Sequence, residues 1–119
     1  MRLIDTIEGE NIIELNDGDL TFTSKAAVDV DGIGDDHGDP DYQNDTSLHQ
    51  NGQALNADSD CYVVVPPQII RFVRGVVLGC QAYVLNISNG HYSEAVVGDI
   101  GPHDKLGEIS RALAISLGR

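Results

Sequence analysis

The sequence predicts a mainly β protein, a small closed barrel of six or more strands with one short C-terminal helix. Runs of apolar and β-branched residues, separated by Gly, Asn, Asp and Pro, recur along the chain and are typical of short strands joined by turns. Only segment 111–117 combines helical spacing with end signals on both sides. A closed barrel is expected because it leaves no strand edge exposed. With 119 residues, the chain should form a single domain, residues 1–119, with a modest core.

The N-terminal strands are expected to form a meander. The apolar run 11–15 (NIIEL) is followed by Asn-Asp-Gly at 16–18 and by a second run at 20–24. Asn-Asp-Gly between two apolar runs indicates a hairpin. A third strand over 26–30 follows with little interruption, so the three strands predict a small β-meander.

The middle of the chain predicts a buried strand and then a hairpin. The run 62–65 (YVVV) is ended by two prolines, which cannot continue a strand ladder. Residues 73–87 are apolar and β-branched with two glycines among them, which favours one bent strand, or two joined by a bulge, over a helix. Asn89-Gly90 marks a tight turn, so 76–98 predicts a hairpin.

The C-terminal segment 95–119 places two carboxylates around one loop. An apolar run ends at Gly98, Asp99 stands at its end, and a Gly-Pro pair then turns the chain into a polar loop. Glu108 follows the loop and precedes a helix predicted over Arg111–Leu117, with a serine N-cap and a glycine stop. For an arbitrary pair, a turn-capping aspartate and a glutamate that favours a helix N-terminus would be the better interpretation.

Segment 29–60 is rich in Asp, Gly, Asn and Ser and predicts one or two long functional loops. Its sequence DVDGIGDDHGDPD does not match an EF-hand, which needs D-x-D-x-D-G, a glutamate at position 12 and flanking helices. A solvated acidic loop is the default interpretation, and a calcium site of another type is a minor alternative. We predict no metal site from this pattern. The aspartates of the stretch are Asp29, Asp31, Asp35, Asp36, Asp39, Asp41, Asp45, Asp58 and Asp60.

The chain is strongly acidic, with nineteen acidic against seven basic residues and a formal charge of −12. Long-range repulsion disfavours nucleic acid, anionic membrane surfaces and other polyanions as partners. A polycation would be attracted instead. Taken alone, however, the acidity is better explained by solubility than by a polycationic partner.

No cofactor is expected. The glycines of DGIGDDHG do not follow a strand into a helix, so no phosphate-binding loop is indicated, and the histidines show no metal spacing. Cys61 and Cys80 are either buried small residues or one disulfide, with free thiols slightly favoured.

The first ten residues, MRLIDTIEGE, lack the apolar core of a signal peptide. The sequence therefore predicts a cytoplasmic protein, unless it is a mature chain or a phage or bacterial protein that is secreted or released by another route.

Several motifs recur in the order shown by a known enzyme family. They are VDVDG at 28–32, GDPDYQ at 38–43, TSLH at 46–49, YVVVPPQI at 62–69 and VVGDIGP at 96–102, followed by GEISRALAISLG. On these motifs the chain resembles the glycoside hydrolase family 75 chitosanases over roughly Leu20 to Gly118. The C-terminal pattern is also similar to double-psi β-barrel proteins of the rare lipoprotein A and expansin type. The resemblance implies a six-stranded double-psi-like β-barrel with one short C-terminal helix.

The resemblance implies an inverting endo-chitosanase that cleaves β-1,4-linked glucosamine polymers. Glu108 would be the general acid and Asp99 the general base, with about 6.5 to 9.5 Å between the two carboxyl groups. The sequence alone permits the reverse order of roles. A cationic polysaccharide such as chitosan, or another amino-sugar polymer, is the expected partner. The residues expected to bind it are Asp29, Asp31, Asp39, Tyr42, Gln43, His103 and Lys105.

Two other classes of function fit the same predicted fold. A phage or bacterial enzyme could cleave peptidoglycan in the manner of a lytic transglycosylase with Asp99 alone, and a non-catalytic module could bind glycans. Glu108 distinguishes these in part, because a one-acid transglycosylase does not need it. Proteins of both families usually continue past the Leu-Gly with a further strand. Either strand 11–15 takes that place or an edge stays open for a partner chain, so the oligomeric state is left open.

Overall fold

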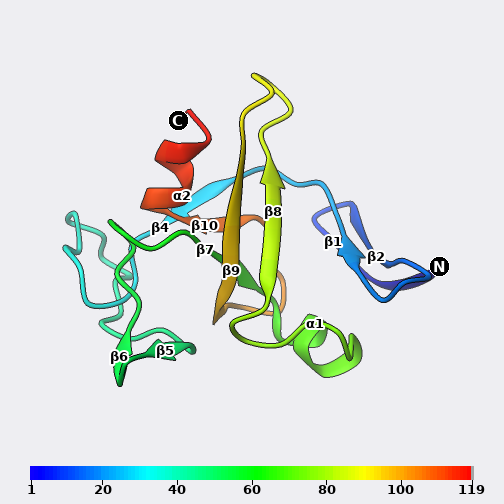
Figure 1. Ribbon diagram of the computed structural model, residues 1–119, viewed down its shortest axis with the longest axis horizontal. Coiled ribbons are helices and arrows are strands. Elements are labelled where there is room, and N and C mark those ends of the chain that lie inside the picture. The colour runs from blue at the N-terminus through cyan, green and yellow to red at the C-terminus, as the bar shows by residue number, and fades with distance from the viewer. Residues whose placement is uncertain (119) are drawn as a thin grey trace.

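The computed structural model describes residues 1–118 and is mainly β, as the sequence predicts (Figure 1). The elements in chain order are β1 (Arg2–Ile7), β2 (Glu10–Glu14), β3 (Leu20–Thr21), β4 (Ala27–Asp29), β5 (His49–Gln50), β6 (Gln53–Ala54), β7 (Tyr62–Val65), α1 (Pro67–Phe72), β8 (Gln81–Leu85), β9 (Tyr92–Ile100), β10 (Glu108–Ser110) and α2 (Arg111–Ser116). Each of the two helices has six residues, and no helix of the described chain is long and apolar enough to cross a bilayer.

The central sheet has five strands in the order β4-β10-β7-β9-β8. The pairs β4/β10 and β7/β9 are parallel, whereas β10/β7 and β9/β8 are antiparallel. Parallel neighbours require long crossover connections, so strands far apart in sequence lie side by side. The two edge strands, β4 and β8, are not paired with each other among the described residues, and hydrogen bonding therefore gives an open sheet.

The N-terminal sheet has the order β1-β2-β3. The predicted hairpin is confirmed, since β2 and β3 pair across the turn at 16–18. The predicted third strand of the meander is wrong in its pairing. Its residues form β4, which joins the central sheet beside β10, and β1 completes the N-terminal sheet instead. Val28 lies opposite Ile109 in this pairing, a contact between distant parts of the chain that local turn signals do not specify.

The C-terminal helix is confirmed as α2. The hydroxyl of Ser110 accepts a hydrogen bond from the N–H of Leu113 at 3.2 Å, and Gly118 lies beyond the helix at φ +82°. Leu113 and Leu117 are buried against the sheet. The expectation of only one helix is wrong, because the two prolines that end β7 also begin α1. Proline suits a helix N-terminus, since its φ is already helical and the missing N–H has no helical partner there.

The β8–β9 hairpin is confirmed, with Gly90 at φ +78° in its turn. The preceding strand is shorter than expected, because residues 73–80 form turns. Gly79 adopts φ +88°, and the N–H of Cys80 bonds to the carbonyl of Val77 at 3.1 Å. Strand β9 is longer than expected and continues through Ile100, so Asp99 lies within the strand and not after it.

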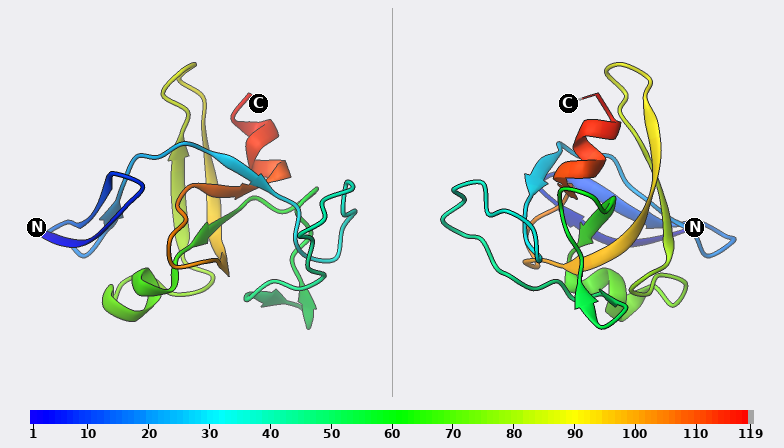
Figure 2. Two further views of the ribbon diagram at one scale, coloured as in Figure 1. Left: turned by 180° about the vertical axis from the view of Figure 1, so that it is seen from behind. Right: turned by 60° about the vertical axis from the view of Figure 1, so that its left-hand side comes forward.

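Three apolar clusters hold these parts together. One joins the N-terminal sheet to the central sheet through Ile7, Ile12 and Ile69, a second lies under the acidic loops around Tyr62, and the third lies beneath α2. The acidic loops and the N-terminal sheet lie at opposite ends of the molecule (Figures 1 and 2). Both cysteines are free, and they pack against different clusters.

Candidate active site

An acidic pocket of about 610 Å³ opens where the acidic loops meet the central sheet. Strands β4, β7, β9 and β10 each contribute to its wall, and the loops at 31–47 and 101–105 supply the rest. Its lining residues are Val28, Asp29, Asp31, Asp39, Asp41, Gln43, Asp45, Thr46, Ser47, Val64, Asp99, Ile100, Gly101, Pro102, Lys105 and Glu108. Seven of these are carboxylates and one is a cation, so the lining is predominantly acidic.

A β-bulge in β9 turns Asp99 into this pocket. Val63 lies opposite Val97 and Val64 opposite Asp99, so Gly98 is an extra residue between two pairs. Neighbouring residues of β7 face opposite sides, and the bulge therefore places Val97 in the core and Asp99 on the other face. A Cβ on Gly98 would lie 2.6 Å from the Cβ of Tyr62, so only glycine fits this position.

Three donors converge on one oxygen of Asp99. The N–H and the hydroxyl of Ser47 donate to its Oδ1 at 2.9 and 2.8 Å, and the N–H of Ile100 donates at 3.0 Å. The loop that carries Ser47 is fixed by buried Thr46, whose hydroxyl donates to the Leu48 carbonyl and accepts from the N–H of Leu55. One carboxylate oxygen is therefore held in place, which leaves Oδ2 to act on a ligand.

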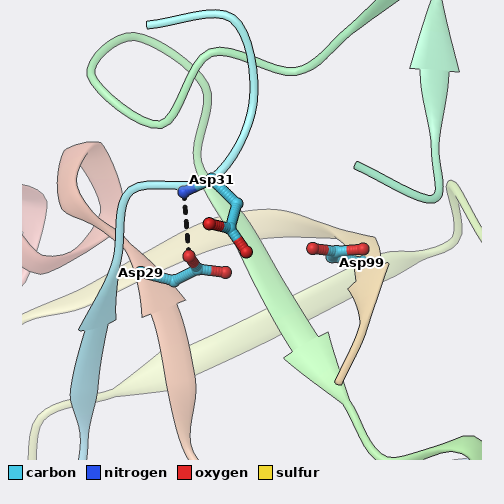
Figure 3. A group of neighbouring side chains, drawn as sticks. All are labelled: Asp29, Asp31 and Asp99. Atoms are coloured by element: carbon cyan, nitrogen blue, oxygen red, sulfur yellow. Dashed lines mark hydrogen bonds between the residues drawn. The ribbon is translucent and has the colours of Figure 1, made fainter. Parts of the chain in front are cut away.

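Asp29 and Asp31 lie side by side across the pocket from Asp99 (Figure 3). The N–H of Asp31 donates to Oδ1 of Asp29 at 2.9 Å, and the N–H of Gln43 donates to Oδ1 of Asp31 at 2.8 Å. Burial, and to a smaller extent the neighbouring carboxylates, raise the pKa of Asp29 to about 7 against the opposing effect of the hydrogen bond from Asp31. Burial also raises the pKa of Asp31.

Glu108 enters the pocket from β10, the strand that precedes α2. Burial raises the pKa of its carboxyl group, and the nearby ammonium group of Lys105 acts in the opposite direction. Gly101 passes close beneath it, since a Cβ there would lie 3.1 Å from Oε2 of Glu108 and 2.9 Å from Cγ1 of Val64. A partly buried carboxyl group with a raised pKa keeps its proton to a higher pH than an exposed one, which favours the role of general acid.

Three of these carboxylates could also hold a cation. One oxygen from each of Asp29, Asp31 and Asp99 lies within 4.8 Å of the others. Carboxylate oxygens are the ligands preferred by hard divalent cations such as Ca²⁺. The sequence predicts no metal site here because the spacing does not match an EF-hand, and only the fold brings Asp99 close to Asp29 and Asp31.

The pocket gathers most of the residues singled out from the sequence. Asp29, Asp31, Asp39, Gln43, Asp99, Lys105 and Glu108 all line it. Tyr42 does not, because its hydroxyl donates to the carbonyls of Gly32 and Gly34 and its ring packs on the cluster around Tyr62. His103 is exposed outside the lining, with its carbonyl accepting from Nε2 of Gln68 at 2.7 Å.

Four polar residues of the lining were not predicted from the sequence, namely Asp41, Asp45, Thr46 and Ser47. Asp41 and Ser47 lie within the motifs GDPDYQ and TSLH, and Asp45 directly precedes TSLH, so the motifs marked the right loop. Their roles depend on contacts across the fold, which one sequence does not reveal. No protein-family model and no curated protein matches the chain, so the proposed activity depends on this geometry and on the motif resemblance.

Proposed function

We propose that the protein is an endo-acting glycosidase that cleaves β-1,4-linked glucosamine polymers with inversion, using Asp99 and Glu108 as its acid-base pair. The observation that carries the proposal is that these two carboxylates come from different strands, line one pocket and have different surroundings. Asp99 is held by three donors, whereas Glu108 is partly buried and has a raised pKa. Inverting hydrolysis needs such a pair, one carboxyl protonated and one ionised.

In the proposed reaction Glu108 protonates the glycosidic oxygen as the bond to the anomeric carbon breaks. A water on the opposite face attacks that carbon and gives its proton to Oδ2 of Asp99, the oxygen that the Ser47 donors leave available. The net result is addition of water across one glycosidic bond. Ser47 and Ile100 keep the base oriented throughout, because their hydrogen bonds go to Oδ1.

The charge of the pocket supports an amino sugar as the substrate. Seven carboxylates line it against the single ammonium group of Lys105. Glucosamine units carry ammonium groups in mildly acidic solution, and each would meet carboxylates such as Asp31 and Asp39 on the loop side. The same field repels anionic polymers, which disfavours peptidoglycan as a substrate.

We further propose that the strands have the order of a double-psi-like barrel of the kind the motifs imply, with the sheet left open between β4 and β8. Support comes from the strand order, in which β10 lies between β4, its parallel neighbour, and β7, its antiparallel one. Strands β7 and β9 form a second parallel pair, which again needs a long crossover connection. Asp99 on β9 and Glu108 on β10 therefore lie on the two strands that flank β7.

The deciding experiment compares products from chitosan, chitin and peptidoglycan under identical conditions. We expect glucosamine oligomers from chitosan, with the α-anomer released first because inversion changes the β-linkage, and little product from the other two polymers. Cleavage of peptidoglycan to anhydro-sugar products would support the transglycosylase alternative. Binding without cleavage of any polymer would favour a glycan-binding module.

A further inference from the structure

Strand β8 is an edge of the central sheet with a row of backbone groups that face outward. Among the described residues it pairs only with β9, and Tyr83 lies opposite Glu94. The N–H of Asn86 donates to the His91 carbonyl, and the carbonyl of Cys80 accepts from Val97, so even-numbered residues bond to β9. Antiparallel bonding alternates. The N–H and C=O groups of residues 81, 83 and 85 therefore point away from β9, where the described chain has no strand.

This edge lacks the features that usually protect a sheet edge. Natural edges carry charged residues, prolines or bulges. Residues 81–85 contain no charge and no proline, and their register with β9 is regular. Residues 81, 83 and 85, whose backbone groups point outward, also have exposed side chains. Tyr83 is 71% exposed and Leu85 is 58% exposed. A regular, uncharged edge strand with exposed Tyr and Leu side chains is suited to pair with another strand.

The distribution of charge along the chain bears on whether a second copy could pair with β8. No Asp, Glu, Lys or Arg occurs between Arg74 and Glu94, although the chain has nineteen acidic and seven basic residues. A second copy of this chain carries the same charge of −12 and is repelled by most of the surface. Residues 75–93, which include β8, add none of this charge, so two copies can approach at this edge with less repulsion than at the acidic loops.

We propose that β8 is a docking surface for a second copy of the chain, through antiparallel pairing of β8 with β8 about a two-fold axis at Tyr83. Tyr83 of each copy then faces Tyr83 of the other, and residue 81 faces residue 85 in both directions. The contact is isologous, as closed dimers require. The two Glu94 residues are three strand spacings apart, about 14 Å, which exceeds the Debye length of about 10 Å at 0.1 M salt.

The dimer leaves the acidic pocket open. β8 lies at one edge of the sheet and β4, which carries Asp29, at the other. The docking surface shares no residue with the pocket lining, so its test is independent of the proposed activity.

The test measures molar mass by sedimentation or light scattering over a wide range of protein concentration. We expect a monomer–dimer equilibrium for the parent protein and monomers for Tyr83→Lys and Tyr83→Pro. Proline is tolerated by the sheet at this position because the N–H of residue 83 does not bond to β9. Tyr92→Lys is the matched control. Tyr92 is 75% exposed on the same face but lies on β9, away from the edge, and its variant should still dimerise. A parent protein that is monomeric throughout, or a dimer that survives both Tyr83 substitutions, would overturn the proposal.

Hydrogen exchange of the parent protein gives a second test that needs no variant. The amides of residues 81, 83 and 85 should gain protection as the protein concentration rises, whereas those of Ala82 and Val84, bonded to β9, should be protected at every concentration. Exchange at 81, 83 and 85 that does not depend on concentration would contradict pairing at this edge.

Discussion

Ser47 donates both its backbone N–H and its hydroxyl to the same oxygen of Asp99, at 2.9 and 2.8 Å. The two residues are 52 positions apart in the chain, so the contact is a product of the fold. Ser47 touches no reacting atom in the proposed mechanism and is therefore a positioning residue, which fixes the direction in which Oδ2 of Asp99 points.

We expect Ser47→Ala to lower kcat on chitosan by about tenfold to a hundredfold, with KM little changed. A hydrogen bond to a charged group contributes about 1.5 to 3 kcal/mol, and each 1.36 kcal/mol in the barrier is about a tenfold change in rate. Ser47→Thr keeps the hydroxyl and should restore most of the rate. Equal kcat values for the Ala variant and the parent protein would show that the base is held without this hydroxyl.

The second prediction concerns how the free energy of unfolding of the protein depends on pH. Because the pKa of Asp29 is about 7 in the fold and 3.8 without its environment, the folded state binds more protons than the unfolded state between these values. The free energy of unfolding therefore falls as the pH rises from about 4 to about 7. The raised pKa values of Asp31 and Glu108 act in the same direction.

Asp29→Asn removes this titration but keeps an oxygen to accept the N–H of Asp31. We expect the variant to be more stable than the parent protein at pH 8 by about 1 to 2 kcal/mol, a figure reduced for the partial exposure of the carboxyl, and to differ little at pH 4. Urea unfolding at both pH values measures this. Asp17→Asn, on an exposed turn, retains Asp29 and is the control, so its stability should follow the same pH profile as that of the parent protein. Identical pH profiles for parent and Asp29→Asn would contradict the prediction.

The fold class follows from the sequence because strands and turns have local signals. The hairpin around Gly90 and the helix capped by Ser110 are set by residues within one or two turns of each other. The pairing of Val28 with Ile109 has no such local signal, and the meander prediction failed there. The two prolines after β7 both end that strand and begin α1, and only the end of the strand was predicted.

The candidate site was predictable where one loop brings its own ends together, as it does for Asp99 and Glu108. The orientation of Asp99 was harder to predict, because it depends on the bulge at Gly98. The core around Tyr62 requires a glycine at that position. The Ser47 contact could not be predicted from one sequence, since a serine in a polar loop is most often solvated.

The third prediction is that binding of glucosamine oligomers weakens strongly with salt. The attraction between the pocket carboxylates and sugar ammonium groups is screened as the Debye length falls from about 10 Å at 0.1 M to about 3 Å at 1 M salt. Calorimetric titration at both salt concentrations should show a large loss of affinity for glucosamine oligomers. Neutral chitin oligomers of equal length are the control, and equal salt dependence for both ligands would show that charge does not drive binding.

The fourth prediction is that chelation leaves hydrolysis unchanged. Asp29, Asp31 and Asp99 have oxygens close enough to share a cation, but the proposed reaction uses only proton transfers by Asp99 and Glu108. Dialysis against EDTA should therefore preserve chitosan cleavage. Loss of activity that Ca²⁺ restores, but not Na⁺ at equal ionic strength, would assign these three carboxylates to a metal site instead.

The last prediction tests the acid-base pair. Asp99→Asn and Glu108→Gln keep side-chain size and an acceptor oxygen, yet neither can perform its proton transfer. Each should lower kcat on chitosan by about two to four orders of magnitude, the usual contribution of a positioned acid or base. Stability should change little for Asp99→Asn. It should rise slightly for Glu108→Gln at neutral pH, because burial disfavours the charged form of Glu108.

Asp104→Asn is the matched control for both variants. Asp104 is an exposed carboxylate on the loop that joins the pair, outside the pocket lining, and its substitution should leave kcat unchanged. If Glu108→Gln and Asp29→Asn both stay active while Asp99→Asn is inactive, a one-acid transglycosylase becomes the better account. If Asp29→Asn is as inactive as Asp99→Asn while Glu108→Gln is active, Asp29 is the general acid, which its pKa of about 7 would permit. If both variants of the pair keep full activity, hydrolysis does not depend on Asp99 and Glu108, and the assignment fails.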